Sequence, residues 1–276
     1  MQAKRVIIIN DCFDANARLR IEAQVAMAFP NLPITFYASE PFATLSLSFL
    51  LAEAEFTNGD VVLFNAAPRN ATQKVEGNRA GEMVFVKVKT GGLLVGPNEG
   101  HSLTLIKDQI ETIYTKRADD GNVSGTQFRS AYVFPKAAGE FMAMPEERRD
   151  KLYASHTATD YPIPVLTADY IAWIDSFDNI KLTRRSTQEP LLQPGHEYIV
   201  RFKRDGRLVK EVRLPYREKL TLLNNGELGI ITGSSFGQTG LEIARRTGVV
   251  KLPGAVAYIH EQFGFTPYVE DEGQIS

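Results

Sequence analysis

The first half of the chain alternates short, fully apolar runs with longer segments that favour helices. Val6–Ile9 and Val61–Phe64 lack polar alternation, which is typical of strands buried on both faces. Residues 17–28 and 46–56 favour helices, and Pro30 ends the first of them. This order of strands and helices predicts an α/β domain with a central, mostly parallel sheet.

The same half contains five further predicted elements, the first of which is a short strand at Ile34–Tyr37. Met83–Val88 and Gly92–Val95 are expected to form paired strands, joined by a turn that contains Gly91. Thr104–Ile113 and Ala131–Met144 are expected to be helices, and Pro145 follows the second.

The pattern changes after Pro145. A charged run and a Thr/Pro/Asp-rich stretch predict a linker over residues 146–165, after an α/β domain at 1–150. Residues 166–276 predict a smaller all-β, barrel-like domain with one helix at Leu241–Arg246. Its expected strands are short and alternating: Tyr170–Ile174, Glu197–Phe202, Leu208–Leu214 and Leu228–Ile231.

Composition narrows the classes of function. The chain carries 31 Lys+Arg against 33 Asp+Glu, and this net charge of −2 argues against a nucleic-acid-binding protein. One cysteine excludes an internal disulfide, and four scattered histidines argue against a zinc or iron site. We therefore assign no metal ligand among the candidate site residues and expect no cofactor, although magnesium held by carboxylates remains compatible with the sequence. The sequence shows no targeting or membrane-spanning segment, so we expect a cytoplasmic protein without a membrane partner.

Three segments carry candidate chemistry. Asp11 follows the first buried strand, where ligands bind in open α/β sheets, although a turn or helix-capping role is equally compatible. Ile174–Asn179 combines Asp175, Phe177 and Asn179, which could bind a purine, or could be a strand and turn with a core Phe. Gly233–Gly240 is a polar, Gly-rich loop that suits an anion, or is a flexible loop without a ligand.

These segments occur in an order that resembles the S-adenosylmethionine hydroxide adenosyltransferase family, which includes fluorinating and chlorinating enzymes. The resemblance spans essentially the whole chain. Its most specific parts are Ile174–Asn179 and Gly233–Ala244, supported by Val95–Gly100. It implies an α/β domain followed by a β-barrel, and S-adenosylmethionine as a substrate or ligand rather than a cofactor.

The resemblance also implies a reaction and an assembly. Water or halide displaces methionine from the ribose C5′ carbon in a homotrimer whose sites lie between subunits. By motif match, Asp11 would hold the ribose hydroxyls, while Phe177 and Asn179 would contact adenine. Asp175 would meet the methionine ammonium group, and the methionine carboxylate would lie near two serines, Ser234 and Ser235.

The chain departs from the family where the nucleophile is activated. The hydrolases' catalytic Asp, Arg and His fall on Ala67, Lys74 and Arg129. Ser130 matches a serine at the halide site of the halogenases, but their facing Tyr and Thr fall on Ala67 and Asn70. The candidate catalytic residues are therefore Asn70, Lys74, Arg129 and Ser130.

Three functions remain open from the sequence. The first is hydrolysis of S-adenosylmethionine to adenosine and methionine, with water held by Asn70, Lys74 and Ser130. The second is a catalytically impaired adenosyl-binding or structural homologue. The third is an enzyme with a changed nucleophile or substrate, because Lys74 and Arg129 would favour an anion.

Overall fold

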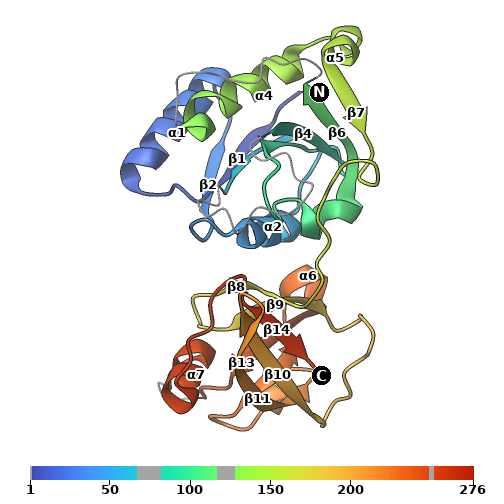
Figure 1. Ribbon diagram of the computed structural model, residues 1–276. Coiled ribbons are helices and arrows are strands. Elements are labelled where there is room, and N and C mark those ends of the chain that lie inside the picture. Colours follow the sequence, from blue (N-terminus) through green and yellow to red (C-terminus); the bar gives the residue numbers. More distant parts are fainter. Residues whose placement is uncertain (1, 67–81, 117–127, 249–251) are drawn as a thin grey trace. The chain divides into compact units, whose positions relative to one another are not determined.

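The computed structural model describes residues 2–66, 82–116, 128–248 and 252–276. The chain divides into two compact units, Met1–Val165 and Leu166–Ser276. Figure 1 shows helices and strands mixed in the first unit and mainly strands in the second. Among the described residues, none of the helices combines the length and the hydropathy required for a membrane span.

A seven-stranded mixed sheet forms the centre of the first unit. Its strands run in the order β2-β1-β3-β5-β4-β6-β7. The pairs β1–β2, β1–β3 and β3–β5 are parallel, whereas β4–β5, β4–β6 and β6–β7 are antiparallel. The expected "mostly parallel" sheet is therefore parallel on one side only. The bounds are β1 Arg5–Asn10, β2 Ile34–Ala38, β3 Asp60–Asn65, β4 Met83–Val88, β5 Leu93–Pro97, β6 Ile110–Lys116 and β7 Tyr153–His156.

Helices cover both faces of this sheet (Figure 1). Alternate residues of β1 show why: Val6 and Ile8 pack with Ile21 of α1, whereas Ile7 and Ile9 pack with Leu47 of α2. The helices are α1 Ala15–Ala28, α2 Thr44–Glu53, α3 Arg129–Tyr132, α4 Phe134–Ala143 and α5 Glu146–Leu152, with a 3₁₀ turn η2 at Thr104–Gln109. Helices on both faces explain why the central strands β1 and β3 are apolar at every position between their polar ends.

Two predicted helices differ from the structure. The segment expected to be one helix at 104–113 forms η2 and then enters β6, where burial alternates because one face meets the core under α2. The predicted helix at 131–144 is divided at Val133 into α3 and α4.

Residues 146–165, predicted as a linker, belong to the first unit. They contain α5 and β7, and β7 pairs with β6. Tyr161 and Ile163 are buried in the same core as β1 and α2. The charged run that suggested a linker is the solvent-exposed α5, in which no residue is buried.

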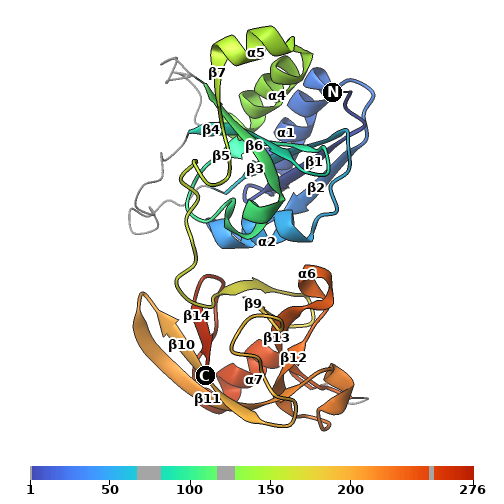
Figure 2. The same cartoon turned by 90° about the vertical axis from the view of Figure 1, so that its right-hand side faces the viewer.

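The second unit is a seven-stranded sheet that closes on itself (Figure 2). Its order is β14-β10-β11-β12-β13-β9-β8, and an antiparallel bridge between Tyr170 and Glu272 joins the two edges. The strands are β8 Ile171–Ile174, β9 Ile180–Arg185, β10 Glu197–Arg204, β11 Arg207–Arg217, β12 Leu228–Thr232, β13 Gly240–Arg245 and β14 Glu272–Ile275. A short helical turn α6 (Ser235–Gln238) and the helix α7 (Ala255–Phe263) complete the unit.

The predicted helix at Leu241–Arg246 is wrong, because this segment is β13. It pairs antiparallel with β12 on one side and with β9 on the other. Its residues 240–244 are all buried, and a central barrel strand satisfies that pattern as well as a buried helix does.

Candidate functional site

The parallel half of the first sheet has its topological switch point between β1 and β3. The chain leaves β1 through α1 towards β2 on one side, while β3 is followed by the strands on the other side. Ligands of open α/β sheets bind at such points, outside the carboxyl ends of the strands. Asp11 follows β1 there, and Asn65 ends β3.

Asp11 is held in place at this edge. Its Oδ1 accepts a 3.0 Å hydrogen bond from the Asn65 side-chain amide, and its Oδ2 accepts one of 3.4 Å from the backbone of Phe42. The residue is 8% exposed. The sequence also allowed Asp11 to be a helix cap. The residue that caps α1 is Asp14, whose carboxylate accepts from the backbone N–H groups of Asn16 and Ala17.

The candidate catalytic residues are described only in part. Asn70 and Lys74 lie outside the described residues. Ser130 is buried in α3, which packs against α1 and β3, so it lies on an element next to the strand that ends at Asn65. The Arg129 guanidinium lies 5.6 Å over the ring of Phe134.

In the second unit, residues 175–179 form a tight loop organised by Asp175. Oδ1 of this carboxylate accepts from the backbone N–H groups of Phe177 and Asn179, and Oδ2 accepts from the Asn179 side chain at 3.2 Å. Phe177 is 78% exposed, so the alternative of a core Phe is wrong. Asp178 has a left-handed backbone and accepts a hydrogen bond from the Ala257 N–H in α7.

The two serines of the second candidate loop, residues 233–240, differ in burial. Ser234 is exposed, whereas Ser235 is buried and donates a 3.3 Å hydrogen bond to Glu242 of β13. Phe236, Gly237 and Gln238 have left-handed backbone angles in succession. The loop is thus a strained, defined turn, and Arg185 stacks 4.8 Å over the Phe236 ring.

Lys181 joins the two loops, and the sequence reasoning missed it. Its Nζ lies 2.7 Å from Glu242 and 3.4 Å from Asp175, and its side chain is 12% exposed. Glu242 is a charge within the apolar part of β13, which was the available signal. Lys181 lies in β9 with Thr183, Arg184 and Arg185, so its own strand gave no such signal. The structure therefore brings Asp175, Asn179 and Ser235 into one network of hydrogen bonds and ion pairs.

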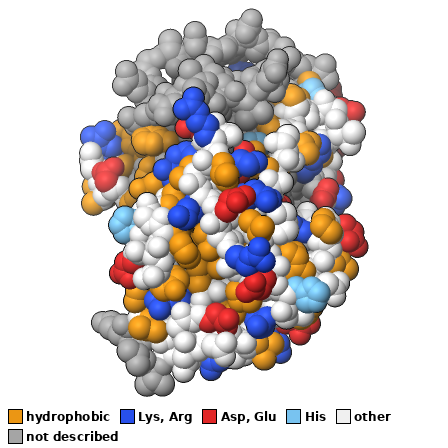
Figure 3. Space-filling model, turned by 60° about the horizontal axis from the view of Figure 1, so that its bottom comes forward, with side chains coloured by type: hydrophobic (Ala, Val, Ile, Leu, Met, Phe, Trp, Pro, Cys, Tyr) orange, Lys and Arg blue, Asp and Glu red, His pale blue; other side chains and the backbone are white. Residues whose placement is uncertain are grey.

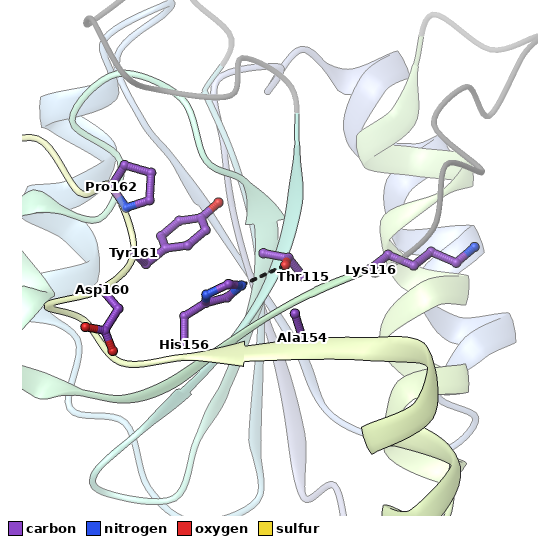
Figure 4. Close-up of a pocket in the computed structure, with 7 residues that line it drawn as sticks. All are labelled: Thr115, Lys116, Ala154, His156, Asp160, Tyr161 and Pro162. Atoms are coloured by element: carbon purple, nitrogen blue, oxygen red, sulfur yellow. Dashed lines mark hydrogen bonds between the residues drawn. The ribbon is translucent and has the colours of Figure 1, made fainter.

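A separate cavity of about 480 Å³ lies at the β6–β7 edge of the first unit (Figure 4). His156 accepts or donates a 3.0 Å hydrogen bond with Thr115, and the Tyr161 hydroxyl donates to Glu82. Asp160 accepts from Thr157. His156 and Thr115 thus bond to each other, whereas Tyr161 and Asp160 bond to residues beside the cavity. The lining includes none of the residues singled out from the sequence.

Charged side chains on the face shown in Figure 3 are intermixed by sign. Among the described residues on this face, basic side chains do not gather into a patch of the kind that binds a phosphate backbone.

Neither a protein-family model nor a curated protein sequence matches the chain. Solved structures do match it over nearly its whole length. An uncharacterized conserved protein from Thermotoga maritima is 18% identical to this chain and has a TM-score of 0.67. The match covers 98% of this chain and 100% of the Thermotoga chain. A conserved hypothetical protein from Thermus thermophilus is 18% identical with a TM-score of 0.62, covering 99% and 100%. These likenesses show that the chain shares its two-domain fold with both proteins.

Proposed function

We propose that this protein binds S-adenosylmethionine, or a related adenosyl compound, and cleaves it with water. The observation that carries the proposal is Asp11 at the switch point, a buried carboxylate that Asn65 orients. A carboxylate is a strong hydrogen-bond acceptor for hydroxyl groups, so Asp11 at this edge of the sheet suits a ribose diol.

The 175–179 loop supports the proposal from the second unit. A carboxylate, an exposed aromatic ring and an amide side chain lie within five residues there, and Asp175 rigidifies the loop. An exposed ring such as Phe177 can stack on a base, and Asn179 can bond to its edge. The net charge of the network formed by Asp175, Glu242 and Lys181 is −1 when all three groups are ionised, which suits a cationic ligand group.

The proposed reaction is a displacement at the ribose C5′ carbon. The water oxygen forms a bond to C5′ as the C5′–S bond breaks, and the electron pair leaves on sulfur to give neutral methionine. The attacking water loses one proton to solvent, so the products are adenosine, L-methionine and H⁺. The sulfonium is already a good leaving group, and the protein contributes orientation and exclusion of bulk water.

The test is to incubate the purified full chain with S-adenosylmethionine in ¹⁸O-labelled water. The proposal expects adenosine and methionine in equal amounts, with the label in the 5′-hydroxyl of adenosine. Absence of turnover above a protein-free control, at micromolar protein over hours, would contradict the hydrolase.

The second candidate is adenosyl binding without catalysis. It is favoured by the loss of the hydrolases' Asp, Arg and His at Ala67, Lys74 and Arg129. Loss of general acid–base help costs about 10²–10⁴-fold in rate. This candidate predicts that the ligand raises Tm without any product, because a ligand that binds only the folded state stabilises it.

The changed-nucleophile alternative is tested in the same assay. The reaction is run in ordinary water with added halide or another anion. A new adenosyl product would then favour a changed nucleophile over hydrolysis. We further propose that the protein is a homotrimer, as the resemblance implies, and sedimentation analysis of the full chain measures this state directly.

A further inference from the structure

We infer that Lys181 and Glu242 are positioning residues that couple the 175–179 loop to the 233–240 loop. Lys181 contacts a carboxylate on each side, Asp175 in one loop and Glu242 beside the other. Glu242 in turn accepts the hydroxyl hydrogen bond of Ser235. The coupling is a property of the second unit alone, whereas its effect on a ligand rests on the proposed function.

The network is buried enough to act as one unit. The side chains of Glu242 and Lys181 are 5% and 12% exposed, and that of Asp175 is 17% exposed. Charges in such surroundings are strongly coupled, because Lys181 pairs with both carboxylates. Removal of the Glu242 charge leaves Lys181 with Asp175 alone, so its ammonium group should move towards that carboxylate. A change at Glu242 should therefore be transmitted through Lys181 to Asp175.

Two glycines leave the space that this network fills. A Cβ on Gly233 would overlap the Glu242 carboxyl, and a Cβ on Gly240 would overlap the Ser235 hydroxyl. Any larger residue at either position would displace the network. Gly233 and Gly240 therefore serve close packing on Glu242 and Ser235.

Asp175 transmits the position of Lys181 to the loop backbone. Its Oδ1 accepts from the N–H groups of Phe177 and Asn179, and its Oδ2 faces both Lys181 and the Asn179 amide. Movement of this carboxylate would release both backbone N–H groups. The exposed Phe177 ring and the Asn179 amide, which carry the adenine contact in the proposed function, would then lose their fixed positions.

The experiment measures hydrogen exchange of the Phe177 and Asn179 amides in the full-length Glu242→Gln variant. Gln keeps the shape of Glu242 and removes its charge, and Glu242 itself does not bond to either amide. Coupling predicts that both amides exchange at least about threefold faster than in the wild type. Unchanged exchange in a folded variant would overturn the inference.

A matched control comes from the same barrel. Lys203 of β10 pairs with Glu272 of β14 at 3.2 Å. Neither residue of this ion pair belongs to the 175–179 loop or the 233–240 loop. Lys203→Met should leave the two amides at their wild-type rates, whereas Lys181→Met should accelerate them. If Lys181→Met does not fold, Lys181→Arg takes its place, because Arg keeps the positive charge. The Phe177 and Asn179 amides should exchange more slowly in Lys181→Arg than in Glu242→Gln.

Fluorescence gives a second measurement. Trp173, the chain's one tryptophan, lies opposite Lys181 in the β8–β9 register. Its emission should change in Glu242→Gln and stay unchanged in Lys203→Met; equal spectra in all three proteins would count against the coupling.

Binding of S-adenosylmethionine, adenosine and L-methionine separates this inference from the proposed function. If the wild type binds none of the three, the proposed function fails, and the exchange data alone decide the coupling. If the wild type binds a probe, Glu242→Gln should weaken Kd roughly 3- to 30-fold. An unchanged Kd together with unchanged exchange would overturn the inference while the proposed function stands.

Discussion

The side-chain amide of Asn65 donates a 3.0 Å hydrogen bond to the carboxylate of Asp11, which links the carboxyl ends of β3 and β1. Two residues 54 positions apart are thereby fixed at the switch point of the first sheet. This hydrogen bond fixes the orientation of the Asp11 carboxylate, which a residue that only forms a turn would not require.

Replacement of Asp11 by Asn should weaken binding of S-adenosylmethionine at least about tenfold, because charge-assisted hydrogen bonds are stronger than neutral ones. Titration calorimetry measures this change. Asp14→Ala is the control in the same loop: it removes the α1 cap and should cost about 1 kcal/mol of stability while leaving ligand affinity unchanged. Equal loss of affinity in both variants would remove Asp11 from the site.

Asp60 should be a major electrostatic contributor to the first unit. Arg5 donates two hydrogen bonds to it, at 2.7 and 2.8 Å, and Asp60 is 1% exposed. Asp60→Asn should lower the free energy of unfolding by about 1.5–3 kcal/mol at neutral pH in urea titrations. The exposed pair Arg18–Glu22, also 2.7 Å apart, is the control, and Glu22→Gln should cost less than about 0.5 kcal/mol.

The same pair predicts a pH dependence. The hydrogen bond from Arg5 lowers the pKa of the Asp60 carboxyl below its ordinary value. A lowered pKa in the folded state means that the stabilisation is complete above the unfolded pKa, about 3.9, and is lost as pH falls through the folded value. Acid titration of unfolding should show this loss in the wild type and a smaller one in Asp60→Asn.

His101 should make stability fall in a different pH range. Burial lowers the pKa of its imidazole, so the folded protein binds this proton less readily than the unfolded chain does. Stability should be highest above about pH 6.5 and decrease at lower pH by up to about 1.4 kcal/mol per unit. Urea unfolding at about pH 7.5 and about pH 5.5, on either side of the unfolded pKa, measures this. His101→Gln should reduce the difference, and the exposed His196→Gln should preserve it.

Two glycine substitutions should have opposite effects. A Cβ on Gly96 would overlap the backbone oxygen of Phe64, so Gly96→Ala should destabilise the first unit by several kcal/mol, about 2–4. Gly139 lies within α4, where a Cβ would meet Ala28 at no less than 3.5 Å. Gly139→Ala should stabilise by about 0.5–1 kcal/mol. Thermal unfolding that ranks the two variants the other way would contradict this packing.

The sequence alone determined the elements whose burial is uniform. Val6–Ile9 and Val61–Phe64 lie within β1 and β3, and the helix predicted at 17–28 lies within α1, because apolar runs and a flanking proline act locally. The position of Asp11 at a strand end also followed from the sequence. Its partner Asn65 did not, since only the parallel pairing of β1 with β3 brings the two together.

Tertiary structure decided the elements whose pattern fits two conformations. Residues 241–244 are buried throughout, and they form a strand because β12 and β9 supply hydrogen-bond partners on both sides. The charged segment at 146–152 looked like a linker, yet the burial of Tyr161 and Ile163 beyond it anchors residues 146–165 to the first unit. Lys181 bridges Asp175 and Glu242 across strands, and no local pattern encodes a contact between residues 61 positions apart. The local sequence determines which residues are buried, whereas the pairing of strands determines which of the buried residues contact one another.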